Sequence, residues 1–320
     1  MKHISKAFAI QVNPTRHVAL TGDKYNNIDA LVDDTSPFWL HFDQPSKHLR
    51  QQLAKKFGLS KAVRNILFAE EQRPRCIKID TGFVLILQGI QPDSLDSLED
   101  PPSLRIWITP NRLLSVATGS ITAIGDMQTA IAELESPDLM TCLATLLEYL
   151  IWYVEEVAYR LDESLDAIET GIGQTDESIV KIAEVRQSIV RLRRYVLPQR
   201  DAIIFLSNKI DTFSTEPVVV MKEISDNMLR QAEMLEMLRE RSAIIQDNLS
   251  NQIGEISNRR MYVLTVMMLI FTPAFFIMSL FSMYVPTPGM SSRDTWWIIL
   301  LFVMALSIAL LILFKKRKWL

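Results

Sequence analysis

The sequence predicts an α+β domain that is followed by long stalk helices and by a hairpin of two transmembrane helices. Short β-rich runs alternate with helical stretches over the first 133 residues, apolar residues then recur at helical spacing, and two long uncharged runs lie near the C-terminus. The chain has 320 residues and a formal net charge of −3 at pH 7. This balance lacks the basic footprint of nucleic-acid-binding proteins, so we expect no nucleic-acid partner.

Residues 1–133 are expected to form a cytoplasmic α/β domain. No apolar stretch of signal-peptide length follows Lys2, His3 and Lys6, so this domain should stay inside the cell. Helices are predicted at Lys47–Phe57 and Lys61–Glu71. The predicted strands are Phe38–Phe42, Cys76–Ile79, Phe83–Gln88, Leu104–Thr109 and Arg112–Ala117.

Residues 134–216 are expected to form two long antiparallel helices. Ser136, Pro137 and Asp138 supply an N-cap, a proline for the first turn and an acidic residue. A turn near Gly171 to Thr175 then leads to a second helix that continues to about Lys209. The apolar series of the first helix is Leu143, Leu147, Leu150, Val154, Val157, Leu161, Leu165 and Ile168.

A third helix is predicted to run from the soluble part into the membrane. Pro217 can open it, and no helix breaker follows before Pro273. If the helix continues to Phe281, its roughly 65 residues span about 95 to 100 Å, so residues 217–260 must be a stalk outside the bilayer. A seven-residue register indicates a seam that requires partner helices. Its members are Met221, Ile224, Met228, Gln231, Leu235, Leu238, Ser242, Ile245, Leu249, Gln252 and Ile256.

Two uncharged runs predict the transmembrane helices. Met261–Met283 has 23 residues and Thr295–Phe314 has 20, enough in each case to cross a hydrocarbon layer of about 30 Å. The connecting residues 284–294 contain two prolines and a glycine and are expected to form a periplasmic loop. Basic residues flank the hairpin on both outer ends, at 259–260 and 315–318, whereas the loop has only Arg293 beside Asp294. The positive-inside rule therefore predicts that both termini are cytoplasmic.

A single two-helix hairpin cannot enclose a polar pathway, so transport would require several copies with their first spans around a shared axis. Neither span contains a charged residue, so a crossing ion would largely keep its water, and we expect no tight protein-ligand metal site. Residues at three- and four-residue steps form the predicted pore-lining stripe, although the same small polar residues could instead pack helix against helix. The stripe comprises Met261, Leu264, Met268, Thr272, Phe275, Ser279 and Met283.

Two polar groups flank the predicted pore. The face below the membrane carries Asp247, Asn251, Gly254, Glu255 and Asn258, which could line a vestibule that concentrates cations or could be a solvated stalk face. The C-terminal cluster could mark topology, bind anionic lipid or form a basic ring that controls ion exit. It consists of Lys315, Lys316, Arg317 and Lys318, within the short C-terminal segment 315–320.

Several segments resemble the CorA superfamily of divalent-cation transporters and, within it, the ZntB branch that is associated with zinc. They are FAEEQRPR at Phe68–Arg75, SLRIWI at Ser103–Ile108, LRRYVLPQRDAI at Leu192–Ile203, RSAIIQDNLSNQI at Arg241–Ile253, the first span, and the terminal KKRKWL. The resemblance implies a funnel-shaped homopentamer in a bacterial inner membrane, with the first spans around the pore. It further implies uptake of hydrated Zn²⁺ as cargo, without a cofactor, and coupling to the proton gradient.

The sequence departs from this family at the outer mouth of the pore. The position of the family's Gly-X-Asn motif is occupied by Ser282, Met283 and Tyr284. Tyr284 can offer a phenolic oxygen but no amide carbonyl to a hydrated ion. Phe275 stands where relatives often carry a small polar residue, and its ring would narrow the passage.

Three function classes remain for comparison. The first is a zinc transporter, or a transporter of magnesium, cobalt or nickel, and the second is a non-conducting scaffold or sensor that retains the assembly. An enzyme is not expected, because there is no glycine-rich phosphate loop and no nucleophile motif, and the four histidines lie in the N-terminal part. Cys76 and Cys142 have no second cysteine or histidine at metal-ligand spacing and are predicted to be isolated buried thiols.

Overall fold

The computed structural model describes residues 7–11, 16–20, 37–69, 73–91, 100–134, 138–171, 175–209, 217–282 and 295–316. The chain divides into two compact units, Met1–Gln246 and Asp247–Leu320. The boundaries expected after residues 133, 216 and 260 stay predictions, as does the loop at 284–294, which lies outside the described residues.

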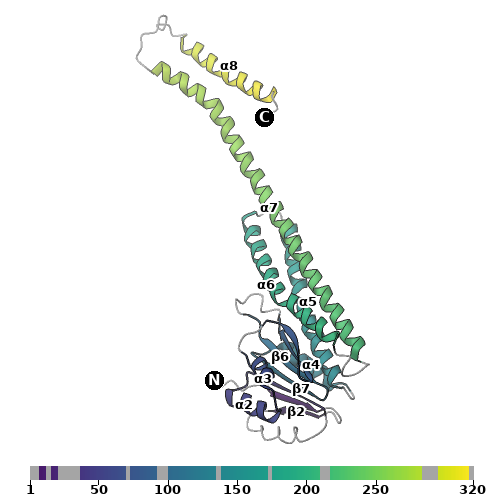
Figure 1. The fold of residues 1–320 in the computed structure, drawn as a ribbon. Helices are drawn as coiled ribbons and strands as arrows, with labels where there is room; N and C mark the ends of the chain where they lie inside the picture. The colour runs from purple at the N-terminus through teal and green to yellow at the C-terminus, as the bar shows by residue number, and fades with distance from the viewer. Residues whose placement is uncertain are drawn as a thin grey trace. The chain divides into compact units, whose positions relative to one another are not determined.

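A mixed β-sheet forms the centre of the first unit (Figure 1). Within the described residues it has seven strands in the order β2-β1-β3-β7-β6-β5-β4, and only the β3–β7 pair is parallel. The five predicted strands are confirmed to within a residue at each end, and two N-terminal strands were missed. The bounds are β1 Ala7–Gln11, β2 Arg16–Leu20, β3 Phe38–Asp43, β4 Arg75–Ile79, β5 Gly82–Gln88, β6 Ser103–Thr109 and β7 Arg112–Ala117.

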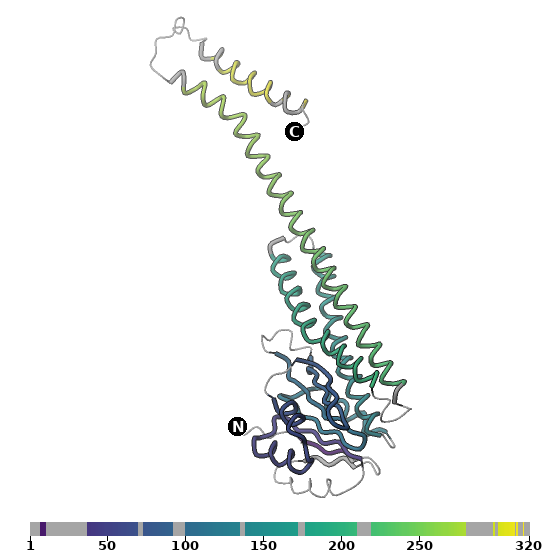
Figure 2. Tube along the Cα trace, viewed as in Figure 1, coloured from purple at the N-terminus to yellow at the C-terminus, as the bar shows by residue number. Residues whose placement is uncertain are grey.

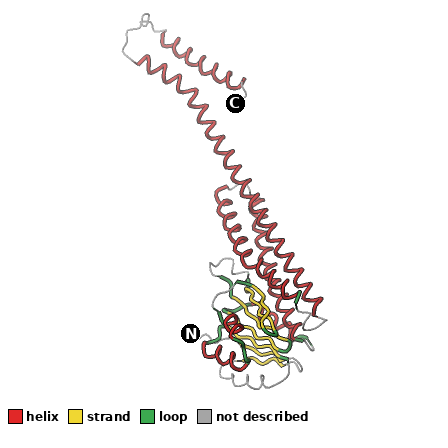
Figure 3. Tube along the Cα trace, in the orientation of Figure 1, coloured by secondary structure: helices red, strands yellow, loops and turns green. Residues whose placement is uncertain are grey.

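Two short helices, α2 (Lys47–Lys56) and α3 (Lys61–Leu67), cover one face of the sheet (Figure 3). Each begins at a serine whose hydroxyl accepts a backbone N–H three residues later, from Leu49 to Ser46 and from Val63 to Ser60, both at 3.3 Å. The predicted extension of the second helix to Glu71 was wrong, because α3 ends at Leu67. Apolar side chains of both helices join those of β3 and β7 in one buried core.

Three further helices complete the fold around the sheet: α4 (Thr122–Ala132), α5 (Leu139–Thr170) and α6 (Thr175–Ser207). Both α4 and α6 pack against α5, and α6 also packs against β4 and β5. The N-cap of α5 is Asp138, whose carboxylate accepts the Thr141 N–H at 2.7 Å. The two long helices were predicted, whereas α4 was not.

Helix α7 begins at Pro217 and ends at Ser282, so the predicted uninterrupted third helix is confirmed (Figure 2). It has 66 residues, and α8 (Thr295–Lys316) has 22. The predicted seam is buried from Met221 to Leu249, whereas Gln252 is half-buried and Ile256 is exposed. Within the first unit, α7 forms ion pairs with α5, through Arg241 and Asp162, and with α6, through Glu236 and Arg193. The seam therefore lies against these two helices.

Arg241 is the centre of the ion-pair network between α7 and α5. Its guanidinium donates to Asp162 Oδ1 and Glu169 Oε2, each at 2.6 Å, and also to the Asp166 carboxylate. These carboxylates, Glu169 first, hold the pKa of Arg241 above its usual range. One cation therefore compensates three carboxylates on the same face of α5.

We expect Arg241→Gln to lower the stability of the full-length protein by about 1 to 2 kcal/mol, because each partly exposed ion pair contributes roughly 0.2 to 1 kcal/mol. The loss should shrink at high salt, which screens the repulsion left among the three carboxylates. Thermal unfolding in detergent at low and high salt measures both effects. Arg239→Gln is the control, since among the described residues Arg239 donates only to Glu236 on its own helix. An equal loss in both variants would contradict the proposed importance of the network.

Candidate pore-lining face

Helix α7 contains the only stretch, among the described residues, that is long and apolar enough to cross a membrane. This stretch lies within Val219–Ser279, and none of its most apolar window is buried. Exposure of such a window distinguishes it from the core helix of a soluble protein. The apolar stretch described in α8, Leu300–Leu310, is shorter, so the helix predicted at Thr295–Phe314 is present but its crossing of the membrane stays a prediction.

One face of α7 forms a groove with a volume of about 530 Å³. Each of its lining residues has another lining residue three or four positions away, which places them on one side of an α-helix. Five of the seven residues of the predicted pore-lining stripe are among them, although their role in a pore stays a prediction. The groove is lined by Leu264, Met267, Met268, Phe271, Thr272, Phe275, Phe276 and Ser279.

The polar atoms of this groove come from two hydroxyl groups on either side of an aromatic ring. Thr272 and Ser279 are exposed and can both donate to and accept from water. Phe275 lies between them and is 73% exposed. Thr265, by contrast, donates its hydroxyl to the Met261 carbonyl at 2.8 Å and so satisfies the helix backbone instead. The groove can therefore contact a hydrated ion at two levels, with an apolar level between them.

The groove and the predicted stripe overlap but do not contain the same residues. Met267, Phe271 and Phe276 line the groove but were not predicted, although each is adjacent in sequence to a predicted residue. Met261 is exposed but does not line the groove. Of the outer-mouth motif, Ser282 is the last residue of α7, and Met283 and Tyr284 lie outside the described residues.

The flanking polar residues are all on the surface where they are described. Asp247, Asn251, Glu255 and Asn258 are exposed on α7, and a Cβ added at Gly254 would meet nothing within 4 Å. Lys315 and Lys316 end α8, with Lys316 exposed, and Arg317 and Lys318 lie outside the described residues. The vestibule and the basic ring stay predictions.

No cluster of three His, Cys, Asp or Glu side chains that could hold a metal ion occurs in the part of the chain that the structure describes. Cys142 is buried and Cys76 is half-buried, and both are free thiols. Burial raises the pKa of each to about 12, so both stay protonated at neutral pH and are poor metal ligands.

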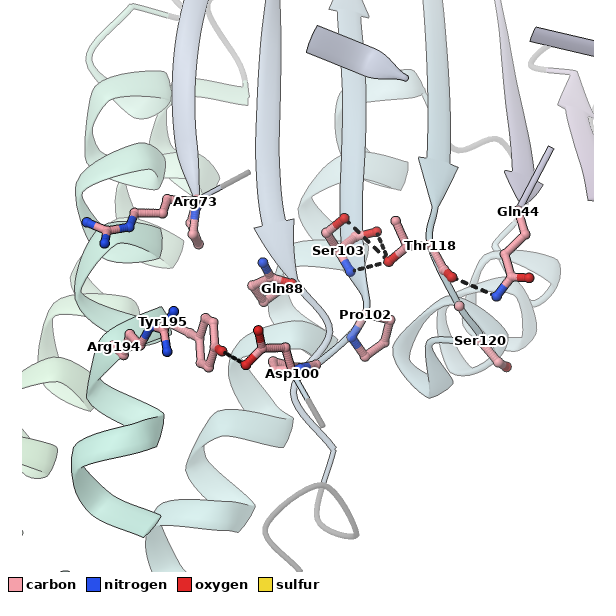
Figure 4. Close-up of a pocket in the computed structure, with 13 residues that line it drawn as sticks. Gln44, Arg73, Gln88, Asp100, Pro102, Ser103, Thr118, Ser120, Arg194 and Tyr195 are labelled. Atoms are coloured by element: carbon pink, nitrogen blue, oxygen red, sulfur yellow. Dashed lines mark hydrogen bonds between the residues drawn. The ribbon is translucent and has the colours of Figure 1, made fainter. Parts of the chain in front are cut away.

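A second cavity, of about 670 Å³, lies in the first unit where β5 ends and β6 begins (Figure 4). Its polar groups bind one another: the Tyr195 hydroxyl donates to the Asp100 carboxylate, and the Ser103 N–H donates to Thr118 Oγ1 at 2.8 Å. Burial, followed by this carboxylate, raises the pKa of Tyr195 to about 12. Figure 4 shows the Arg73 side chain pointing away from Ser103 and Thr118. The cavity is a hydrogen-bonded junction of strands and helix α6, and no nucleophile contacts a base among the described residues that line it.

The sequence of this chain is similar to those of known transporters of divalent cations. The model of a family described as CorA-like Mg²⁺ transporter protein matches residues 34–316. A divalent cation transporter, CmaX, from Pseudomonas aeruginosa is 26% identical over 304 residues, which cover 92% of this chain and 90% of CmaX. The zinc transport protein ZntB from Pectobacterium carotovorum subsp. carotovorum is 26% identical over 298 residues, covering 91% of this chain and 90% of ZntB.

The fold is similar to that of a solved magnesium transporter. The complete structure of CorA from Methanocaldococcus jannaschii superposes with a TM-score of 0.79 at 18% identity, and the match covers 100% of both chains. An identity this low supports the fold alone. The α+β unit followed by long helices is thus a known architecture.

Proposed function

We propose that this chain, which belongs to the family of CorA-like Mg²⁺ transporter proteins, transports divalent metal cations along the groove of α7 in an assembly of several copies. The family is one of transporters rather than enzymes. The observation that carries the proposal is the exposed face of α7, which presents the hydroxyl groups of Thr272 and Ser279 one above the other. Among the described residues, α7 contains the only stretch long and apolar enough to span a membrane.

The chemistry of the groove suits an ion that keeps its water shell. Thr272 and Ser279 are seven positions apart, which is about two helical turns, or roughly 10 Å along the axis. Hydroxyl groups can bind the waters of an ion without replacing them, and the sequence of the span, Met261–Met283, contains no Asp or Glu to bind a bare ion. With Ser282 and Tyr284 at the mouth, the pathway would offer oxygens from the groove to the outer end of the span.

The assembly we propose is a homopentamer in the bacterial inner membrane, with both termini in the cytoplasm. One α7 face cannot surround an ion, whereas a closed ring of identical chains can bring several such faces to a central axis. The basic residues before α7 and at the end of α8 support this orientation.

Zinc is the cargo we propose, with uptake coupled to the proton gradient. The support is the zinc transport protein among the relatives and the resemblance of the cytoplasmic segments to the ZntB branch. A pore for hydrated ions needs no cysteine or histidine ligands, so their absence from the groove residues is compatible with zinc.

Flux into proteoliposomes of the purified full-length protein tests the function. Zn²⁺, Mg²⁺, Co²⁺ and Ni²⁺ should be compared, each with and without a pH gradient. We expect entry of Zn²⁺ above the level of empty vesicles and an increase when the gradient is imposed. Absence of flux for all four ions, with the protein correctly inserted, would reject transport and favour the non-conducting scaffold that Phe275 and the altered mouth motif also permit.

We expect Tyr284→Asn to increase Mg²⁺ flux relative to Zn²⁺ flux by several-fold. The asparagine carbonyl would restore the amide oxygen that relatives present to a hydrated ion, whereas tyrosine offers only its phenolic oxygen. The ratio of the two fluxes in the same vesicle assay measures the change, with Tyr284→Phe as the control that removes the hydroxyl and adds no carbonyl. An unchanged ratio in the asparagine variant would exclude this position from ion selection.

A further inference from the structure

Charge is segregated among the helices of the first unit. Residues 113–159 contain seven Asp and Glu residues and no Lys or Arg, whereas residues 185–200 contain five Arg residues and no Asp or Glu. The acidic stretch covers α4 and the first half of α5, and the basic stretch lies within α6. One chain thus carries two surfaces of opposite charge.

The acidic surface is a groove of about 990 Å³ between α4, α5 and the beginning of α7. Four carboxylates line it, those of Asp126, Glu133, Glu148 and Glu155, against one guanidinium, that of Arg230. Burial and repulsion from Glu223 raise the pKa of Glu148, as expected where negative charge is not fully compensated.

Aromatic side chains also line this acidic groove. Trp152 is 51% exposed and Tyr149 lies beside it in the lining. A large exposed tryptophan within a concave surface is typical of a protein interface rather than of a surface in contact with water. The groove therefore requires a partner that combines positive charge with an apolar centre.

The exposed face of α6 has this composition. Arg186, Val190 and Arg194 are spaced by four residues, share one side of the helix, and are all exposed. Val190 is 53% exposed between the two arginines. Arg186 donates to the Gln246 amide and Arg194 lies over the ring of Tyr195, and since both groups are neutral, the positive charge of this face is retained.

We infer that the acidic groove of one copy binds the basic face of α6 of a neighbouring copy. None of the described residues that line the groove belongs to α6, so the two surfaces are different patches of the same chain. An interface between different patches is heterologous, and its repetition forms a ring when the rotation from copy to copy closes. Opposite charges fix the register of such an interface, while tryptophan, tyrosine and arginine provide its centre. The inference rests on the ring assembly proposed above and names the surfaces that build it.

Charge-reversal variants of the full-length protein in detergent test the interface. Glu148→Lys with Glu155→Lys makes both surfaces basic, and Arg186→Glu with Arg194→Glu makes both acidic. We expect either pair to raise the protein concentration at which half of the oligomer dissociates by about tenfold or more, since facing like charges cost several kcal/mol. All four substitutions in one chain restore opposite charges across the interface and should return this concentration to nearly that of the parent. Native mass spectrometry over a dilution series gives these values.

Matched controls separate this interface from a general effect of charge. Glu163→Lys reverses the charge of an exposed residue of α5 that lies two turns beyond the groove. Lys181→Glu reverses the charge of an exposed residue of α6 that precedes the basic stretch. Both should leave dissociation unchanged, and an equal effect in the controls would overturn the inference.

Three other results would also overturn the inference, each with a different meaning. Unchanged dissociation in both paired variants would exclude these surfaces while leaving the transport proposal intact. A monomeric parent protein would reject the ring and the pore together. Dissociation of the acidic-groove variant without rescue by the fourfold variant, together with loss of Co²⁺ binding measured by titration, would identify the groove as a cation site.

Discussion

Replacing Phe275 by serine is expected to raise divalent-cation flux into proteoliposomes about tenfold, which corresponds to a barrier lower by roughly 1.4 kcal/mol. The ring is 73% exposed and lies between the hydroxyl groups of Thr272 and Ser279 on the groove of α7. In a ring of identical chains, each copy would add one phenyl group at the same height, and such an apolar constriction excludes water and hydrated ions. Serine removes the constriction and makes the hydroxyl levels continuous.

The control for Phe275 is an apolar residue on another side of the same helix. Ile277 does not line the groove, and no groove residue lies three, four or seven positions from it, so Ile277→Ser should not increase flux. Equal amounts of correctly inserted protein must be compared, because a serine that faces lipid reduces stability. If both variants conduct like the parent, Phe275 does not face the pathway, and the polar residues of α7 pack against other helices instead.

The fold could be predicted where the sequence contains uninterrupted patterns. Helix α7 follows from the absence of a helix breaker between Pro217 and Pro273, and the seam follows from a regular register of apolar residues. Strand β5 follows from the run GFVLILQ, in which every residue is buried. In each of these segments the element that local propensity favours is also the one that tertiary packing requires, so the pattern predicts the structure.

The missed elements lack such local signals. Helix α4 has Ile121 at its N-cap, without a side-chain cap, and contains Gly125 in its first turns. Its position depends on packing against α5, which no local pattern indicates. Strands β1 and β2 have five residues each and pair with each other, and β1 also pairs with β3, which is distant in sequence.

The candidate site could be predicted only in part, for a physical reason. Helical spacing identified the side of α7 that carries Thr272 and Ser279, and the structure groups these residues in one groove. In the proposed assembly, whether that side faces water or lipid depends on neighbouring copies, since apolar residues occupy every side of this segment. The width of the groove, which includes Met267, Phe271 and Phe276, depends on side-chain volume rather than on periodicity.

Gly82→Ala is expected to destabilise the first unit by about 3 kcal/mol or more, the upper range for overpacking a buried site. A Cβ at this position would lie 2.5 Å from the Ile108 carbonyl oxygen and 3.1 Å from Thr109 Cγ2. The carbonyl belongs to β6, which pairs with β5 from Phe83 to Gln88, so it cannot move away without a break at this end of the β5–β6 ladder. The thermal unfolding midpoint of the full-length protein, followed by circular dichroism in detergent, should fall accordingly.

Gly125→Ala is the matched control, since it adds the same methyl group in open space. Nothing lies within 4 Å of a Cβ at Gly125, which is within helix α4. Alanine restricts the unfolded chain and favours the helix, so stability should rise by about 0.5 to 1 kcal/mol. Opposite signs in the two variants would show that the close approach of β5 to β6, and not the loss of glycine itself, governs the result. A Gly82→Ala midpoint equal to that of the parent would show that β6 can shift at this point, contrary to the packing of the sheet.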